Sequence, residues 1–193
     1  MIPFNHLGLI FKLFTSFVYP AGARKDLADA VNAIRTDAAV LDIGSGTGIL
    51  TQFVRNGRAD LRYVCLDPAP GMLKYVPGYA HKIEGNAEEL PFRNQVFGVV
   101  LVGDALHHLS NPTKAITEMI RCLDSRGTLF IFDINPGTFM GRLIRGLEVL
   151  FNEPATFYLP EELECIFVGR SSFVKTRHYG WRYTIIASGF DKP

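Results

Sequence analysis

The sequence has no excess of charge of either sign. Its 20 lysines and arginines nearly balance its 19 aspartates and glutamates, which leaves a net charge of +1. A protein that binds nucleic acid through the phosphates carries a surplus of positive charge, so we expect no nucleic-acid partner. Hydrophobic residues make up 48% of the chain and charged residues 20%. These proportions are typical of a globular protein and exclude a disordered one.

Cysteine is also scarce. The three cysteines are Cys65, Cys122 and Cys165, and each lies in an apolar segment. Three cysteines cannot all pair with one another, and none has the spacing of a metal ligand. We therefore expect reduced, buried thiols in a cytoplasmic protein, and no metal site.

Long apolar runs are absent too. Residues 7–18 are mostly apolar, but this run is shorter than the ~20 residues that span a bilayer, and Lys12 interrupts it. No positively charged stretch precedes it, as a secretory signal requires, so we expect no export. The sequence shows no internal repeat, low-complexity tract or linker, and residues 1–193 are expected to form a single domain.

The most informative stretch that is present covers residues 40–48. An apolar run ends at Asp42, and Gly44, Gly46 and Gly48 then alternate with small polar residues. This pattern predicts a buried strand, a tight turn and the start of a helix, an arrangement that binds small molecules at the carboxyl end of the strand. The dinucleotide fingerprint would place its third glycine at Ile49, and no Gly-Lys-Ser/Thr follows as in a P-loop. The glycines alone leave a nucleotide site and a plain tight turn open.

Apolar segments of strand and helix type alternate along most of the chain, which predicts a parallel sheet with helices on both faces. The end of the chain differs, because two strand-like runs, residues 173–179 and 183–190, are separated only by Gly180 and Trp181. That connection is too short for a parallel crossover and predicts an antiparallel hairpin. The expected strands before the hairpin cover residues 40–43, 62–67, 80–84, 96–102 and 128–134, and the expected helices 27–34, 49–54, 72–76, 112–123 and 139–151.

Four sequence blocks occur in an order and spacing that resemble a known family. They are residues 42–48 (DIGSGTG), 66–73 (LDPAPGML), 84–92 (EGNAEELPF) and 103–109 (GDALHHL). With these blocks the chain resembles the class I S-adenosylmethionine (SAM) methyltransferases, in the methyltransferase type 11 group that includes quinone-pathway enzymes. The resemblance extends from about residue 40 to 190. It implies an α/β, doubly wound, Rossmann-like sheet of seven mostly parallel strands with a C-terminal antiparallel hairpin.

The resemblance also implies a cofactor site. Asp67 is expected to accept hydrogen bonds from the ribose hydroxyls, a charge-assisted arrangement, although a helix cap is an alternative role. Asn86 offers both a donor and an acceptor to the adenine edge, and Asp42 is expected near the α-amino group of the cofactor. The full expected set is Asp42, Gly44, Ser45, Gly46, Gly48, Asp67, Pro68, Met72, Asn86, Ala87, Gly103 and Asp104. The implied cofactor is SAM, with S-adenosylhomocysteine as its product.

The reaction implied is an in-line transfer of the sulfonium methyl group to a small acceptor. Orientation of the two reactants supplies most of the catalysis, and a general base adds to it where the acceptor must lose a proton. His107 and His108 follow the fourth strand and are the candidate bases. A buried structural histidine is the alternative.

Two amphipathic helices are expected outside the minimal sheet, within residues 1–21 and 137–152. Their apolar faces favour an apolar or aromatic acceptor if they form a lid over the site. The alternatives are a core helix, a homodimer face and a peripheral contact with a membrane surface.

The predicted function is methyl transfer from SAM to a small, apolar or aromatic molecule. A SAM-binding regulatory protein without catalysis is one alternative, and an NAD(P)-dependent oxidoreductase is another. A nucleic-acid methyltransferase is disfavoured, since residues 103–106 replace the Asn/Asp-Pro-Pro-Tyr motif that such amino-methylating enzymes commonly carry.

Overall fold

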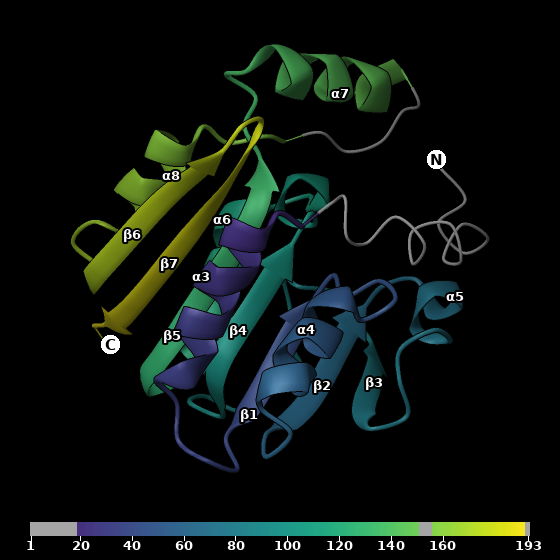
Figure 1. Ribbon diagram of the computed structural model, residues 1–193, viewed down its shortest axis with the longest axis vertical. Helices are drawn as coiled ribbons and strands as arrows, with labels where there is room; N and C mark the ends of the chain where they lie inside the picture. Colours follow the sequence, from purple (N-terminus) through teal and green to yellow (C-terminus); the bar gives the residue numbers. More distant parts are fainter. Residues whose placement is uncertain (1–18, 151–155, 192–193) are drawn as a thin grey trace.

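The computed structural model describes residues 19–150 and 156–191. The segment expected to form the N-terminal amphipathic helix, residues 7–18, lies outside the described residues. The described residues contain one seven-stranded sheet with the order β3-β2-β1-β4-β5-β7-β6 (Figure 1). The strands are β1 (Ala39–Ile43), β2 (Arg62–Asp67), β3 (Ala80–Glu84), β4 (Phe97–Gly103), β5 (Leu123–Ile134), β6 (Ser171–Tyr179) and β7 (Arg182–Phe190).

The first five strands are parallel, and β7 runs antiparallel to both β5 and β6. The expected fold class, a mostly parallel Rossmann-like sheet ending in an antiparallel hairpin, is therefore confirmed. The helices are α3 (Ala21–Asn32), α4 (Ile49–Gly57), α5 (Pro70–Leu73), α6 (Pro112–Cys122), α7 (Phe139–Leu150) and α8 (Pro160–Phe167), with a 3-10 turn η1 (Leu106–His108).

Each face of the sheet has its own apolar core. Helices α3 and α4 pack on one face, and α6 and α8 pack on the other. The central strand β4 supplies both cores because successive strand side chains point to opposite faces. Val99 and Leu101 belong to the α3/α4 core, while Val100 and Val102 belong to the α6/α8 core. This two-sided burial explains why the central strands are continuous apolar runs.

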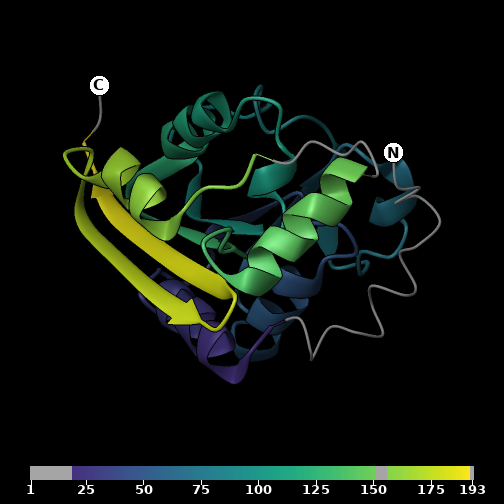
Figure 2. The same ribbon diagram turned by 90° about the horizontal axis from the view of Figure 1, so that it is seen from above.

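Helix α7 belongs to neither layer. It lies across the end of the sheet where β1, β2, β4 and β5 terminate, which we call the carboxyl edge (Figures 1 and 2). Among the described residues of α7, only Gly141 is buried. A side chain at that position would collide with the Asn135 carbonyl oxygen, which would lie 1.9 Å from an added Cβ. The exposed apolar side chains of this helix are Phe139, Met140, Leu143, Leu147, Val149 and Leu150.

Several elements differ from the sequence expectation. Helix α3 spans Ala21–Asn32 rather than residues 27–34, and α5 spans Pro70–Leu73 rather than residues 72–76. Strand β5 begins at Leu123 rather than at residue 128, because the chain leaves α6 directly into pairing with Phe97 across an irregularity in the ladder. Helix α8 was not expected at all. Pro160 occupies its first turn, and the Glu162 carboxylate accepts a hydrogen bond from the backbone N–H of Leu159 at 2.8 Å, a starting signal that the sequence contains.

The predicted glycine turn follows β1, and it adopts a conformation that favours glycine. Gly44, Gly46 and Gly48 have φ angles of 59°, 53° and 78°, values that L side chains rarely adopt. Gly44 is also closely packed, since an added Cβ would lie 2.4 Å from the Ala105 side chain. The turn therefore brings β1 into contact with the loop after β4 through packing within the protein itself.

The C-terminal hairpin is joined to the parallel part of the molecule by Asp26 of α3. Its carboxylate is fully buried. It accepts hydrogen bonds from Arg177 Nη1 at 2.8 Å, Tyr179 Oη at 2.6 Å and Thr184 Oγ1 at 2.7 Å. All three donors come from β6 and β7, so one side chain connects the first described helix to the last two strands.

We expect Asp26→Ala to lower the free energy of unfolding by about 2–4 kcal/mol, because it leaves buried hydroxyl donors without an acceptor. Urea unfolding followed by circular dichroism measures the change. Asp29→Ala is the matched control on the same helix, since Asp29 is exposed and forms a surface ion pair with Lys25, and it should cost less than about 0.5 kcal/mol. Equal losses in the two variants would contradict the anchoring role of Asp26.

No helix among the described residues is both long enough and apolar enough to cross a bilayer. The cytoplasmic location stays a prediction.

Candidate functional site

The carboxyl edge collects acidic side chains from four adjacent strands. Asp42 lies in β1, Asp67 ends β2, Asp104 directly follows β4, and Asp133 lies near the end of β5. Three of these carboxylates, those of Asp42, Asp67 and Asp133, are almost fully buried. Parallel strands place their carboxyl ends together at one edge of the sheet, where open α/β sheets bind ligands.

Asp67 joins β2 to the glycine turn. Its Oδ2 accepts the Gly46 N–H and its Oδ1 accepts the Ala69 N–H, both at 2.8 Å. Burial raises the pKa of Asp67 above its ordinary value, and these two hydrogen bonds oppose that shift. Asp67 is not the N-cap residue of α5, which is Ala69 and has no side-chain cap; the Asp67 carboxylate instead holds the glycine turn and the start of the next loop. The contact of Asp67 with a ribose stays a prediction. Each oxygen of its carboxylate has a further lone pair that can accept a hydroxyl.

Asp42 is held from the other side of the same turn. Its Oδ2 accepts the Thr51 backbone N–H at 3.1 Å and the Thr51 hydroxyl at 2.8 Å, which ties β1 to the first turn of α4. Burial raises the pKa of Asp42 to about 7, because these donors only partly replace water and the nearby Asp67 charge adds to the shift. The contact of Asp42 with the cofactor's amino group stays a prediction.

The remaining expected cofactor residues surround the turn. Met72 is buried, and its Cε lies 3.3 Å from the point where a Gly46 Cβ would be. Ser45 is also buried and donates its N–H to the Leu66 carbonyl at 3.1 Å. Pro68 is exposed beside Asp67. The hydroxyls of Ser45 and Thr47 are both buried with no hydrogen-bond partner among the described residues, and such groups can bind a ligand that reaches the turn.

Asn86 and Ala87 follow β3, at the same end of the sheet. Asn86 is exposed, and its Oδ1 accepts the Glu88 N–H at 3.0 Å. Ala87 is buried in the α6/α8 core. Asn86 therefore stabilises its own loop, and its role at an adenine edge stays a prediction.

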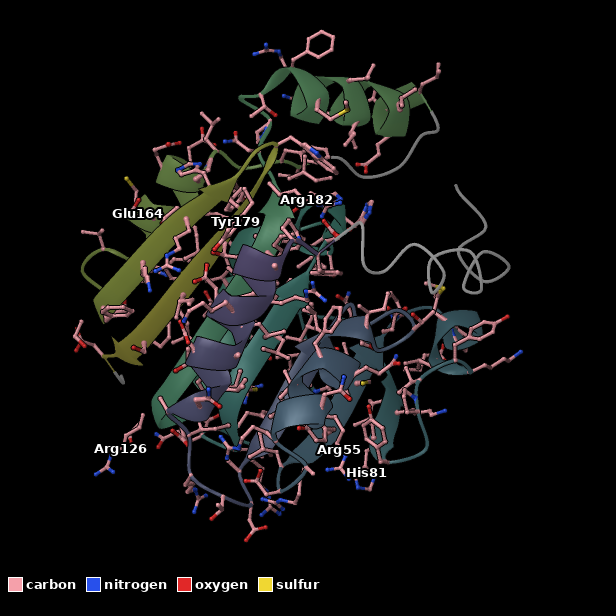
Figure 3. The ribbon with its side chains drawn as sticks, viewed as in Figure 1. Arg55, His81, Arg126, Glu164, Tyr179 and Arg182 are labelled. Carbon is pink, nitrogen blue, oxygen red and sulfur yellow. The ribbon has the colours of Figure 1, made fainter. Side chains whose placement is uncertain are left out.

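Gly103 and Asp104 form the loop after β4, where Tyr19 and Arg182 also meet. An added Cβ on Gly103 would lie 2.7 Å from the Tyr19 hydroxyl, and the Tyr19 ring packs 4.7 Å from that of Phe132. Asp104 forms an ion pair with Arg182, whose guanidinium also lies over the Phe132 ring. Figure 3 shows Arg182 below α7, at the carboxyl edge. Burial raises the pKa of Asp104, although Arg182 opposes the shift.

His107 lies at the other side of this edge, in η1. Its Nδ1 contacts the Asp133 carboxylate, and its Nε2 lies 3.5 Å from Glu148 Oε1 of α7. The Phe157 ring stacks on it at 4.5 Å. Burial alone would lower the pKa of His107, but the Asp133 and Glu148 carboxylates outweigh this effect and raise the pKa to about 10. A protonated ring cannot accept another proton, so this geometry does not favour His107 as a general base.

His108 lies next to His107, with the two ring centroids 4.1 Å apart, and is half-buried. Its role as a base stays a prediction.

A family model described as a methyltransferase domain matches residues 41–131. The match runs from the middle of β1 into β5 and therefore includes the glycine turn, Asp67, Asn86 and the η1 histidines. This part of the chain is therefore similar to a methyltransferase domain. The resemblance to the class I SAM-dependent methyltransferases of the type 11 group is thus confirmed, and this family implies SAM as the cofactor.

Similar proteins support the same assignment. The ubiquinone/menaquinone biosynthesis C-methyltransferase UbiE of Idiomarina loihiensis is 32% identical over an alignment of 114 residues that covers 54% of this chain and 45% of that protein. The demethylmenaquinone methyltransferase of Renibacterium salmoninarum is 32% identical over 119 residues, or 60% of this chain and 49% of that protein. The chain spans about half the length of the curated relatives it matches.

Solved structures show the fold. A chain in the complex between the Haloferax volcanii Trm112 methyltransferase activator and a methyltransferase superposes with a TM-score of 0.79 at 15% identity, covering 98% of both chains. A SAM-dependent methyltransferase from Thermotoga maritima, described as a possible histamine N-methyltransferase, superposes with a TM-score of 0.73 at 20% identity, covering 96% of this chain and 98% of that one.

Sequence reasoning missed three side chains at the carboxyl edge: Asp133, Glu148 and Arg182. A signal for Asp133 was present, because a lone acid at the end of an apolar strand is the same pattern that identified Asp42 and Asp67. Glu148 interrupts the apolar pattern of α7, but its spacing from His107 gives no sign of their contact. Nothing in the hairpin sequence points Arg182 toward Asp104.

We expect Asp42→Asn to make the ligand-free protein more stable than the parent, and by a larger margin at pH 8 than at pH 5. The folded-state pKa of Asp42 is raised above its unfolded value, so ionisation of this buried carboxyl opposes folding progressively as the pH rises from about 4 to 7. Asparagine keeps an acceptor for Thr51 and removes the charge. The advantage of the variant over the parent should grow by about 2–3 kcal/mol between pH 5 and pH 8, as measured by urea unfolding. An advantage that does not change with pH would show that Asp42 is not the titrating group.

Proposed function

We propose that the protein transfers a methyl group from SAM to a small apolar or aromatic acceptor, and that the glycine turn and the Asp67 carboxylate bind the cofactor. The observation that carries the proposal is the carboxyl edge itself. A glycine turn, two buried carboxylates held by neutral donors and an unpartnered Thr47 hydroxyl lie together within the part of the chain that matches the methyltransferase model.

The charges at this edge suit a cationic ligand. Among the described residues, Asp42 and Asp67 accept hydrogen bonds from backbone N–H groups and a hydroxyl, and no cationic side chain there pairs with either carboxylate. When bound, SAM supplies an activated sulfonium methyl group and carries a positively charged ammonium group. Carboxylates in a partly dry site attract such charges more strongly than carboxylates in water do. Asp42 is assigned to the ammonium end and Asp67 to the ribose.

The acceptor is assigned to the region between η1 and α7. Aromatic side chains border it, since Phe157 stacks on His107 and the Trp181 ring lies under the Arg182 guanidinium at 4.2 Å. Rings of this kind favour a flat, apolar acceptor. The names of the similar proteins refer to ubiquinone and menaquinone biosynthesis, and we propose an acceptor that shares the quinone-type aromatic ring. Helix α7, joined to η1 through Glu148, would cover it and exclude water.

We expect the full chain to bind SAM and S-adenosylhomocysteine in calorimetry more tightly than NAD or ATP. Asp67→Asn should weaken SAM binding by about 10- to 150-fold, which corresponds to ~1.5–3 kcal/mol for hydrogen bonds to a charged group. Glu84→Gln is the matched control, because Glu84 is an exposed acid that ends the neighbouring strand β3, and it should bind SAM as the parent does. Tighter binding of NAD than of SAM would overturn the cofactor assignment.

Transfer is tested separately with methyl-labelled SAM and a panel of hydroxylated aromatic acceptors that includes quinol analogues. Label transferred to a ring-type acceptor would support the proposal. Firm SAM binding with no transfer to any member of the panel or to a cell extract would favour a regulatory SAM-binding protein instead.

A further inference from the structure

His107, His108 and Glu148 meet in space although α7 is far from η1 in the sequence. One ligand atom from each side chain lies within 4.8 Å of the other two. The side chain of His107 is 3% exposed and that of Glu148 is 14% exposed. We propose that these three residues bind a divalent transition-metal ion of the zinc type beside the acceptor region.

The separation between His107 and Glu148 suits a metal better than a hydrogen bond. His107 Nε2 and Glu148 Oε1 are 3.5 Å apart, which is at the limit for an N–H···O interaction. Zinc binds nitrogen and carboxylate oxygen at ~2.0–2.2 Å, and tetrahedral geometry then places neighbouring ligand atoms about 3.4 Å apart. An ion can therefore fit between the two atoms with little movement of either element.

Asp133 sets the orientation of the His107 ring. It contacts Nδ1, and its own Oδ1 is fixed by the Ile134 N–H at 2.7 Å. A histidine that donates its Nδ1–H to a carboxylate presents the lone pair of Nε2 on the opposite side, and this pairing is usual behind metal-binding histidines. In His107 that opposite side faces Glu148.

The second oxygen of Glu148 gives an independent indication of a ligand. Glu148 Oε2 is buried and has no hydrogen-bond partner among the described residues. An unpaired buried carboxylate oxygen is costly unless a cation or a donor meets it. A metal held by Oε1 would be close enough to satisfy it.

A metal bound at Nε2 would take the place of the proton that the His107 ring carries without it. With a proton on His107, one positive ring faces the two negative carboxylates of Asp133 and Glu148. The other nearby pair, Asp104 and Arg182, is already neutral and offers no compensation. A divalent ion bound to a neutral His107 ring would bring the group to zero charge.

Two histidines and one carboxylate leave an open position on the metal, as in catalytic zinc sites. A hydroxyl oxygen of the acceptor would occupy that position and release its proton to solvent more readily there. This role rests on the proposed function, whereas the binding of the metal does not.

The test uses the full chain after treatment with a chelator and desalting. Zinc is titrated against a chromogenic competitor, and cobalt(II) is added in parallel so that its visible spectrum reports the ligand geometry. We expect one equivalent of zinc per chain and a four- or five-coordinate cobalt spectrum. Glu148→Gln and His108→Gln should each weaken zinc binding at least tenfold, and Asp133→Asn by about 10- to 100-fold.

Two control variants test other zinc ligands. Cys165 is an exposed thiol on α8, and His81 is an exposed histidine at the end of the sheet opposite α7 (Figure 3). Zinc binding should be the same in Cys165→Ser and in His81→Gln as in the parent. Loss of zinc in either variant, a six-coordinate cobalt spectrum in the parent, or unchanged binding in Glu148→Gln and His108→Gln would overturn the proposal.

Calorimetry with SAM on the same chelated and zinc-loaded samples separates this proposal from the proposed function. SAM binding without stoichiometric zinc would overturn the metal site and leave the proposed function in place. Zinc binding that depends on Glu148, without SAM binding, would support the metal site and count against the proposed function.

Discussion

The structure depends on how four carboxylates are accommodated at the carboxyl edge of the sheet. A parallel sheet buried on both faces leaves little water at its strand ends, so each acid there needs donors or a counter-charge. Asp67 obtains two backbone N–H groups and Asp42 obtains the donors of Thr51. These bonds also define the glycine turn and the start of α4. The same groups that would bind a cofactor therefore hold the local fold together.

The edge is electrostatically divided. Asp104 and Asp133 face cationic side chains, those of Arg182 and His107. Asp42 and Asp67 face neutral donors, and burial raises the pKa of each because their charged forms are costly there. A positively charged ligand would relieve this cost on the side of the glycine turn. On the other side the charges are nearly balanced, apart from the extra carboxylate that Glu148 brings from α7. The division explains why the cofactor and the acceptor are assigned to different halves of one edge.

Helix α7 connects the two parts of this arrangement. It contributes little to either core, yet Glu148 reaches the buried His107 ring. Most of its large apolar side chains are exposed, so within the described residues the helix is attached mainly near Gly141 and through the contact of Glu148 with His107. Such an attachment leaves an element free to change position when its polar partner changes charge or binds a ligand.

Local sequence patterns were sufficient for the sheet, the hairpin, the glycine turn and the acids Asp42 and Asp67. Apolar runs, turn residues and strand-end acids are local signals, and the physical reasons for them act within a few residues. The short loop of Gly180 and Trp181 likewise required an antiparallel hairpin. Helix α6 also begins at a local signal, since the Asn111 side chain accepts the Lys114 N–H at 3.0 Å. Helix α8 carried comparable local signals and was overlooked.

Contacts between distant segments were decided by the tertiary structure alone. Asp26 meets donors from the hairpin, Arg182 meets Asp104, and Glu148 meets His107, each across a long stretch of chain. No periodicity or spacing encodes such pairs, because they depend on how helices and strands pack after they form. The sequence by itself determined which strands form and where a ligand turn lies. Packing decided which charges are paired at that turn and which remain available, because burial and distance exist only in the folded chain.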